Sequence, residues 1–93
     1  MIPELREIDF EFLRIVLNGE KNLSQIRYKI DLRFWGTSLS TTQKILTKLE
    51  KIGFVRSERR GRRRFVVLTK DGKYFYDWYG RKKRRKGGEN GKR

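Results

Sequence analysis

The sequence predicts an α+β fold in which three helices precede a two-stranded β-hairpin and a final helix. Apolar residues recur at helical spacing in three segments between Leu5 and Ile52. Two short runs rich in β-branched and aromatic residues, 54–57 and 64–68, flank a loop of arginines around Gly61. A second aromatic segment follows at 74–79. Ninety-three residues are enough for one small domain, which we assign to 1–80, with 81–93 as a basic, flexible tail.

The first predicted helix runs from the region of Pro3 to Asn18 and Gly19. Pro3 suits a first helical turn, whereas Asp9 would serve as an N-cap, so the start of the helix stays open between them. One stripe consists of Leu5, Ile8, Phe12, Ile15 and Val16, and a second of Phe10, Leu13 and Leu17. A helix packed on one core needs a single apolar stripe, so two stripes indicate that this helix is covered on two sides.

The next two helices are predicted from capping residues and from their inward positions. Ser24 can cap a helix whose inward residues are Ile26 and Ile30, and a turn containing Phe34, Trp35 and Gly36 follows it. Ser38 caps a third helix that ends at Gly53. Its inward side is Thr42, Ile45, Leu46, Leu49 and Ile52, and its outward side is polar.

The C-terminal part continues with strands at 54–57 and 64–68 and a helix capped by Thr69. Tyr74, Phe75, Trp78 and Tyr79 form an aromatic face on this helix. The basic run that follows either extends the helix for a turn or two or is disordered.

The composition narrows the function. The chain has 25 Lys and Arg against 11 Asp and Glu, a net charge of +14. Residues 1–20 carry five acids and two bases, a net charge of −3. Residues 21–80 carry fifteen bases and five acids, a net charge of +10. Residues 81–93 carry eight bases and one acid, a net charge of +7. The body is therefore basic without its tail, which favours a polyanionic partner.

Other classes of protein fit poorly. The chain contains no cysteine and no histidine, so disulfides, thiolate metal sites and the usual general base are excluded. The longest apolar run, Phe65 to Leu68, is far too short to span a membrane, and the acidic N-terminus is unlike a secretory signal. We expect a soluble cytoplasmic protein without cofactor or metal that is not an enzyme.

Two short motifs carry a resemblance to a known family. Leu46 to Val55 (LTKLEKIGFV) and Leu68 to Gly72 (LTKDG) resemble the helix end and the strand-to-helix junction of MarR and PadR transcription regulators. The resemblance implies a winged helix-turn-helix domain and covers roughly residues 5–79. In size the chain is similar to the small winged-helix regulators of archaea and their viruses, in which case it would act at the nucleoid or in the host cytoplasm. Its longer turn before the third helix, its lack of long terminal helices and its polybasic tail depart from the family pattern.

The resemblance implies that the third helix enters the major groove of double-stranded DNA. The residues in that role are Ser40, Thr41, Gln43, Lys44, Thr47 and Lys48. The wing would hold phosphates or a narrow minor groove with Arg59, Arg60, Arg62, Arg63 and Arg64. Arg27 and Lys29 would clamp the backbone, and the tail residues Arg81, Lys82, Lys83, Arg84, Arg85 and Lys86 would add phosphate affinity.

Each set of residues also has an ordinary structural explanation. A polar helix face or a charge run can be simple solvated surface. Phe34, Trp35, Tyr74, Phe75 and Trp78 could stack bases, but core or dimer packing is the preferred interpretation. The expected homodimer interface consists of Phe10, Leu13, Leu17, Tyr74, Phe75 and Trp78. We therefore predict a sequence-specific DNA-binding regulator, with a sequence-neutral architectural protein and a protein-interaction winged helix as alternatives.

Overall fold

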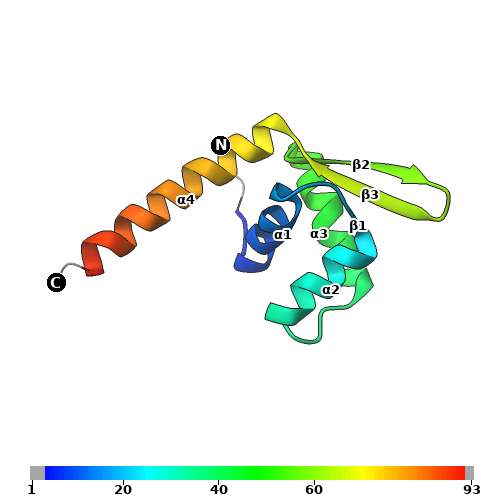
Figure 1. Ribbon diagram of the computed structural model, residues 1–93, viewed down its shortest axis with the longest axis horizontal. Helices are drawn as coiled ribbons and strands as arrows, with labels where there is room; N and C mark the ends of the chain where they lie inside the picture. The colour runs from blue at the N-terminus through cyan, green and yellow to red at the C-terminus, as the bar shows by residue number, and fades with distance from the viewer. Residues whose placement is uncertain (1–3, 92–93) are drawn as a thin grey trace.

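The fold consists of four helices and a small three-stranded sheet (Figure 1). The computed structural model describes residues 4–91, with side chains as far as Arg81. Helices α1 (Glu7–Leu17), α2 (Leu23–Arg33) and α3 (Leu39–Ile52) form the helical core. Strands β1 (Lys21–Asn22), β2 (Val55–Arg60) and β3 (Arg63–Leu68) form an antiparallel sheet in the order β1-β3-β2, and α4 (Lys70–Gly91) follows it. This is the predicted winged-helix arrangement, in which β2 and β3 are the wing.

The N-terminal ends of α1 and α2 differ from the sequence prediction. Asp9 is not the cap of α1 but its third residue, and its carboxylate accepts a hydrogen bond of 2.8 Å from the backbone nitrogen of Arg6. Pro3 lies outside the described residues. Helix α2 is capped by Asn22 rather than Ser24, because Asn22 and Gln25 exchange side-chain-to-backbone hydrogen bonds of 2.9 and 3.0 Å.

The wing is longer than the predicted strands. The register pairs Arg59 with Arg64 and Arg60 with Arg63, so four of the five arginines belong to strands rather than to the loop. The turn is reduced to Gly61 and Arg62, and Gly61 has a positive φ of 63° that favours glycine. Strand β1 was not predicted, because two residues carry no periodicity and form a strand only by pairing with Val66 and Phe65 of β3.

The hydrophobic core lies where α1, α2, α3 and the root of the sheet meet. Its fully or nearly fully buried members include Phe12, Leu13, Ile26, Ile30, Ile45, Leu49, Val55 and Val66. On the other side of α1, Phe10 stacks on Phe75 and Tyr79 of α4. Helix α1 is thus covered on two sides, as its two apolar stripes predict, and the second cover is α4 of the same chain.

Helix α4 is joined tightly to the wing. Thr69 caps it by accepting from the backbone nitrogen of Gly72 at 3.0 Å, and the Thr69 hydroxyl donates to the Gly53 carbonyl at 2.6 Å. The helix then crosses α1 and extends past Gly80, where the sequence predicts the domain to end (Figure 1). The side chains of the tail residues 82–86 lie outside the described residues, so their role stays a prediction.

Candidate nucleic-acid interface

Helix α3 presents a polar face that is held in place at both ends. The Ser38 hydroxyl accepts from the Thr41 backbone nitrogen at 3.1 Å, and Gly53, with a φ of 97°, donates to the carbonyls of Leu49 and Glu50. Thr42, Ile45, Leu46 and Leu49 are buried, as the sequence predicts. The predicted readers Ser40, Thr41, Gln43, Lys44 and Thr47 are all exposed. This face is therefore available to a partner.

Lys48 lies at the edge of that face and forms an ion pair within the protein, which argues against its predicted role in reading DNA. Its ammonium nitrogen lies 2.8 Å from Oδ2 of Asp9, a carboxylate with no exposed surface. A buried carboxylate is costly unless it is paired, so the ammonium group of Lys48 is held at Asp9 while 35% of its side chain stays exposed. Sequence position alone places Lys48 next to the reading face, but the packing of α1 against α3 brings Asp9 within reach of its ammonium group.

Strand alternation divides the wing arginines between the two faces of the sheet. Residues that face each other across an antiparallel pair share a face. Arg59 and Arg64 therefore share the face of Val55 and Val66, which packs on the helices. Glu50 of α3 confirms the orientation, since it accepts hydrogen bonds from both the backbone and the hydroxyl of Ser57 on this face.

Arg60 lies on the opposite face and is already neutralised. Its guanidinium pairs with Glu20, lies 3.6 Å from Glu58, and is stacked over the ring of Phe65 at 4.5 Å from the centroid. This pairing favours a smaller part for Arg60 in the predicted wing contact than for the other four arginines. The acid that holds it, Glu20, is 40 positions away in the sequence.

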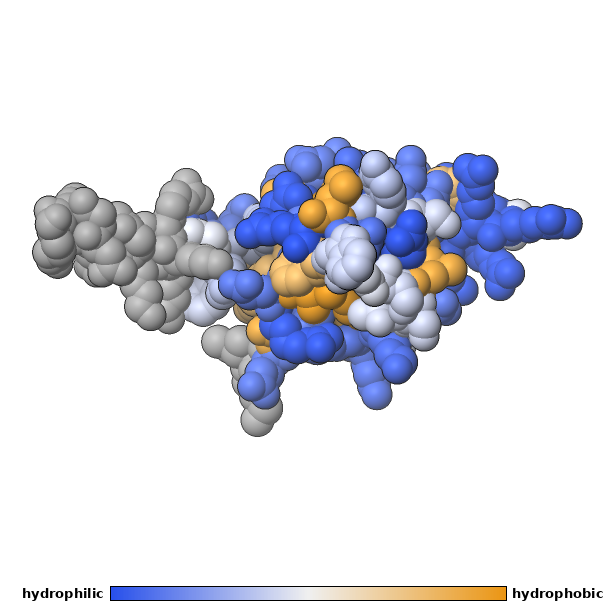
Figure 2. Space-filling model, turned by 90° about the horizontal axis from the view of Figure 1, so that it is seen from below, coloured by the Kyte–Doolittle hydropathy of each residue, from blue (hydrophilic) through white to orange (hydrophobic). Residues whose placement is uncertain are grey.

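A hollow joins the reading helix to the wing. Its lining consists of Asn22, Leu23, Ser24, Leu39, Gln43, Arg59, Arg62, Arg63 and Arg64. Hydrophilic side chains cover the projecting end of the molecule that carries the wing (Figure 2). Because four guanidinium groups and the amide of Gln43 line one concavity, the hollow suits an anionic chain that also carries hydrogen-bonding groups. Sequence reasoning missed Asn22, Ser24 and Leu39, although the Asn22–Gln25 capping pattern is visible in the sequence.

The predicted backbone clamp is divided between two places. Arg27 is half-buried, and its guanidinium lies 3.4 Å from the Thr37 carbonyl in the turn before α3. Lys29 is exposed and lines a different hollow, together with residues of α1 such as Glu11 and Asn18. Arg27 and Lys29 thus have different surroundings, and their joint role as a backbone clamp stays a prediction.

Charged side chains of α1 and α2 form ion pairs with one another where the two helices meet. Glu11, only 4% exposed, pairs with Arg14 and lies 3.2 Å from Arg33. The hydrogen bonds from Arg14 hold the pKa of the Glu11 carboxyl below its ordinary value of 4.5, against the opposing effect of burial. This cluster therefore ties α1 to α2, and the one carboxylate balances one of the two guanidinium charges.

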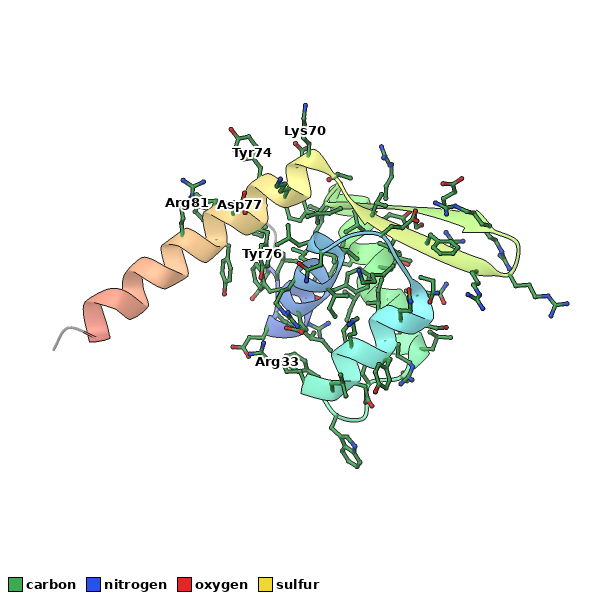
Figure 3. The ribbon with its side chains drawn as sticks, in the orientation of Figure 1. Arg33, Lys70, Tyr74, Tyr76, Asp77 and Arg81 are labelled. Carbon is green, nitrogen blue, oxygen red and sulfur yellow. The ribbon has the colours of Figure 1, made fainter. Side chains whose placement is uncertain are left out.

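The aromatic residues considered for base stacking differ in how far they are buried. Phe34 is half-buried against the core, as expected. Trp35 is 93% exposed, so it does not pack in the core of this chain, and dimer packing or base stacking stays open for it. The turn that carries it is ordered by Asp31, whose carboxylate accepts from the backbone nitrogens of Gly36 and Thr37 at 2.7 and 3.0 Å. On α4, Tyr74 is 75% and Trp78 42% exposed, and Tyr74 points away from the body while Tyr76 points toward α1 (Figure 3).

Two further features of the described residues bear on alternative classes. Within residues 4–91, no helix has the length and apolar character needed to cross a membrane. Among the side chains that the structure describes, no three acidic residues gather as ligands of a metal ion would.

Comparison with solved structures supports the fold. A transcriptional regulator from Clostridium thermocellum is 18% identical, with a TM-score of 0.74 over 91% of this chain and 87% of that one. The homodimeric winged helix-turn-helix domain of Mb0332 from Mycobacterium bovis is 20% identical, with a TM-score of 0.67 over 78% of this chain and 64% of that one. PadR from Bacillus subtilis, solved with operator DNA, is 25% identical, with a TM-score of 0.65 over 80% of this chain and 47% of that one.

The family comparison is more specific than the structural one. No curated protein sequence matches the chain. A family model described as the DUF6293 C-terminal winged helix domain matches residues 4–80, which include all three core helices, the wing and the start of α4. The chain belongs to this family of winged helix domains.

Proposed function

We propose that this chain binds double-stranded DNA as a sequence-specific transcription regulator, with α3 in the major groove and the wing on the backbone or in the minor groove. One observation carries the proposal: Gln43 of α3 and the wing residues Arg59 and Arg64 line the same hollow. A single duplex can then be read by the helix and held by the wing at once. PadR, which has a similar fold, was solved with operator DNA.

The reading face offers chemistry that distinguishes bases. The exposed amide of Gln43 can pair bidentately with adenine, and Lys44 can reach the acceptors of guanine. A good pair of this kind contributes about 1–3 kcal/mol of discrimination, which corresponds to roughly 5- to 150-fold in affinity. The wing arginines would contribute affinity that does not depend on sequence.

The test is selection of bound duplexes from a randomised pool, followed by footprinting of the selected site. Gln43→Ala and Lys44→Ala should weaken binding to the selected site by about 5-fold or more while leaving binding to unrelated duplexes nearly unchanged. Lys51→Ala is the matched control, since Lys51 is exposed on α3 one turn beyond the readers. A pool that shows no enriched sequence contradicts the proposal.

A sequence-neutral architectural function is the second candidate, favoured by the net charge of +10 on residues 21–80. It predicts a steep dependence of affinity on salt and similar affinity for all duplexes. Under this function, substitutions at Gln43 or Lys44 matter far less than substitutions in the wing. The protein-interaction alternative predicts no change in elution on size exclusion when duplex is added.

We further propose a homodimer formed through α1 and α4. Tyr74 and Trp78 are the exposed contacts, and the half-buried Phe10, Leu17 and Phe75 would border them. Leu13 is fully buried within the chain and cannot contribute, which corrects that part of the expected interface. The similar domain of Mb0332 is described as homodimeric. Two-fold symmetry would place the two α3 helices in major grooves about one helical turn apart, on a pseudo-palindromic site.

Sedimentation equilibrium tests the dimer. Replacing both Tyr74 and Trp78 by serine should shift the protein to monomer, whereas Tyr28→Ser, which changes a comparably exposed tyrosine on α2, should not. A wild-type protein that stays monomeric at about 100 μM, alone and with duplex, rules the interface out.

A further inference from the structure

Leu39, the first residue of α3, is a large apolar residue that is not buried in the core. Its side chain is 47% exposed beside an otherwise polar reading face. It lines the hollow shared with the wing, and it also lines a second hollow along α3 with Ser40, Gln43, Lys44 and Thr47. Leu39 and Gln43 are the two residues common to both hollows. An apolar group therefore lies at the centre of the surface proposed to meet DNA.

The spacing of Leu39 and Gln43 fits two neighbouring base pairs. They are four positions apart on one helix, so they lie on the same side with a separation of about 6 Å along the axis. Successive base pairs are about 3.4 Å apart. Two side chains one helical turn apart can thus touch base pairs that are adjacent or separated by one.

The chemistry of the two groups points to A·T pairs. The amide of Gln43 matches the donor and acceptor of adenine in the major groove. Thymine carries the 5-methyl group in that groove, and an apolar side chain is what contacts it favourably. The exposed half of Leu39 offers such a surface, and its buried half anchors the side chain so that little rotamer freedom is lost on contact.

From this geometry we infer that Leu39 is a specificity-determining residue that reads the 5-methyl group of a thymine within two base pairs of the adenine contacted by Gln43. The inference rests on the proposed DNA-binding function. It adds a second, apolar determinant that the polar readers do not supply. The predicted half-site contains closely spaced A·T pairs under the N-terminal turn of α3.

The experiment removes one methyl group at a time from the DNA. Starting from the site selected out of the randomised pool, each thymine is replaced by deoxyuridine, and affinity is measured by fluorescence anisotropy. At one thymine per half-site, replacement by deoxyuridine should weaken binding of the wild-type protein about fourfold, because that is the contribution of one buried methyl group to affinity. In Leu39→Ala, deoxyuridine at that position should make no difference.

Two controls keep the result specific. Leu32→Ala removes a leucine that is 71% exposed on α2, and it should keep the full fourfold penalty. Thermal melting verifies that Leu39→Ala is folded, as expected for a half-exposed residue in the first turn of a helix. If Leu39→Ala responds to every deoxyuridine as the wild-type protein does, the inference is overturned while the proposed function stands. If the pool yields no selected sequence, both the inference about Leu39 and the proposed function are contradicted.

Discussion

Replacing Arg59 by alanine should reduce the salt dependence of DNA binding, whereas the same change at the adjacent Arg60 should leave it unaltered. Arg59 lies on the helix-facing side of the wing and lines the hollow with Gln43. Arg60 lies on the far side and is paired with Glu20 and Glu58. The two residues are identical in type and adjacent in sequence, so each is the control for the other.

The size of the effect follows from counterion release. Each phosphate contact contributes a slope of about −0.9 to the dependence of log K on log salt concentration. Loss of one contact should therefore lower the slope by about 0.9, and between 50 and 200 mM salt the wild-type protein should lose roughly 3.5-fold more affinity than the variant. The double variant at Arg59 and Arg64 should lower the slope by about 1.8.

The assay is a series of fluorescence-anisotropy titrations of one labelled duplex at five or six salt concentrations. Arg60→Ala should give the wild-type slope within about 0.2, because its charge is already balanced within the protein. Equal reductions of slope in Arg59→Ala and Arg60→Ala would refute the division of the wing into two faces. A larger effect at Arg60 would reverse it.

Three further predictions concern the framework of the site. Gly72→Ala should lower the free energy of unfolding by about 2 kcal/mol and the melting temperature by roughly 8–16 °C. A Cβ at this position would lie 2.1 Å from the carbonyl oxygen of Phe54, and the better helix propensity of alanine offsets only part of that clash. An unchanged melting temperature would show that α4 can move away from Phe54. Glu11→Gln should lower that free energy by about 1–2 kcal/mol at pH 7. Because the pKa of Glu11 is depressed in the folded state, its contribution to stability is full above pH 4.5 and is lost as the pH falls below that value. Urea titrations should therefore show that the difference in unfolding free energy between Glu11→Gln and the wild-type protein shrinks below pH 4.5. A difference that stays constant with pH would contradict the ion pair of Glu11 as its source. Lys48→Ala should lower that free energy by about 1–3 kcal/mol, because Asp9 then keeps only the backbone nitrogen and the guanidinium of Arg6 as partners. It should change the DNA affinity of the folded protein by less than twofold, and a large loss of affinity in a fully folded variant would assign Lys48 to the reading face.

Local signals in the sequence predicted the elements that depend on nearby residues. Ser38, Gly53 and Thr69 act through hydrogen bonds to residues within four positions, so their capping roles can be recognised from sequence. The inward stripe of α3 follows from helical periodicity alone. The start of α1 stays open in the sequence and the cap of α2 differs from the predicted Ser24, because several residues near each start could serve and backbone geometry selects among them.

The wing shows where local signals end. An arginine-rich segment between two apolar runs indicates a hairpin, but the pairs that extend it to Arg60 and Arg63 depend on the register of the two strands. A shift of the register by one residue would exchange the faces on which Arg59 and Arg60 lie. The sequence therefore identifies the wing but does not assign its arginines to faces.

The order of helices and strands, the polar face of α3 and the basic character of the wing can be read from the amino-acid sequence, because periodicity, capping and charge runs are properties of neighbouring residues; the winged-helix fold follows from that order together with the resemblance. The folded structure is needed to see which of the cations are already paired within the protein. Lys48 is neutralised by Asp9, 39 positions away, and Arg60 by Glu20, 40 positions away. Such pairs form only when packing brings distant segments together, so no local pattern distinguishes these cations from Lys44 or Arg59.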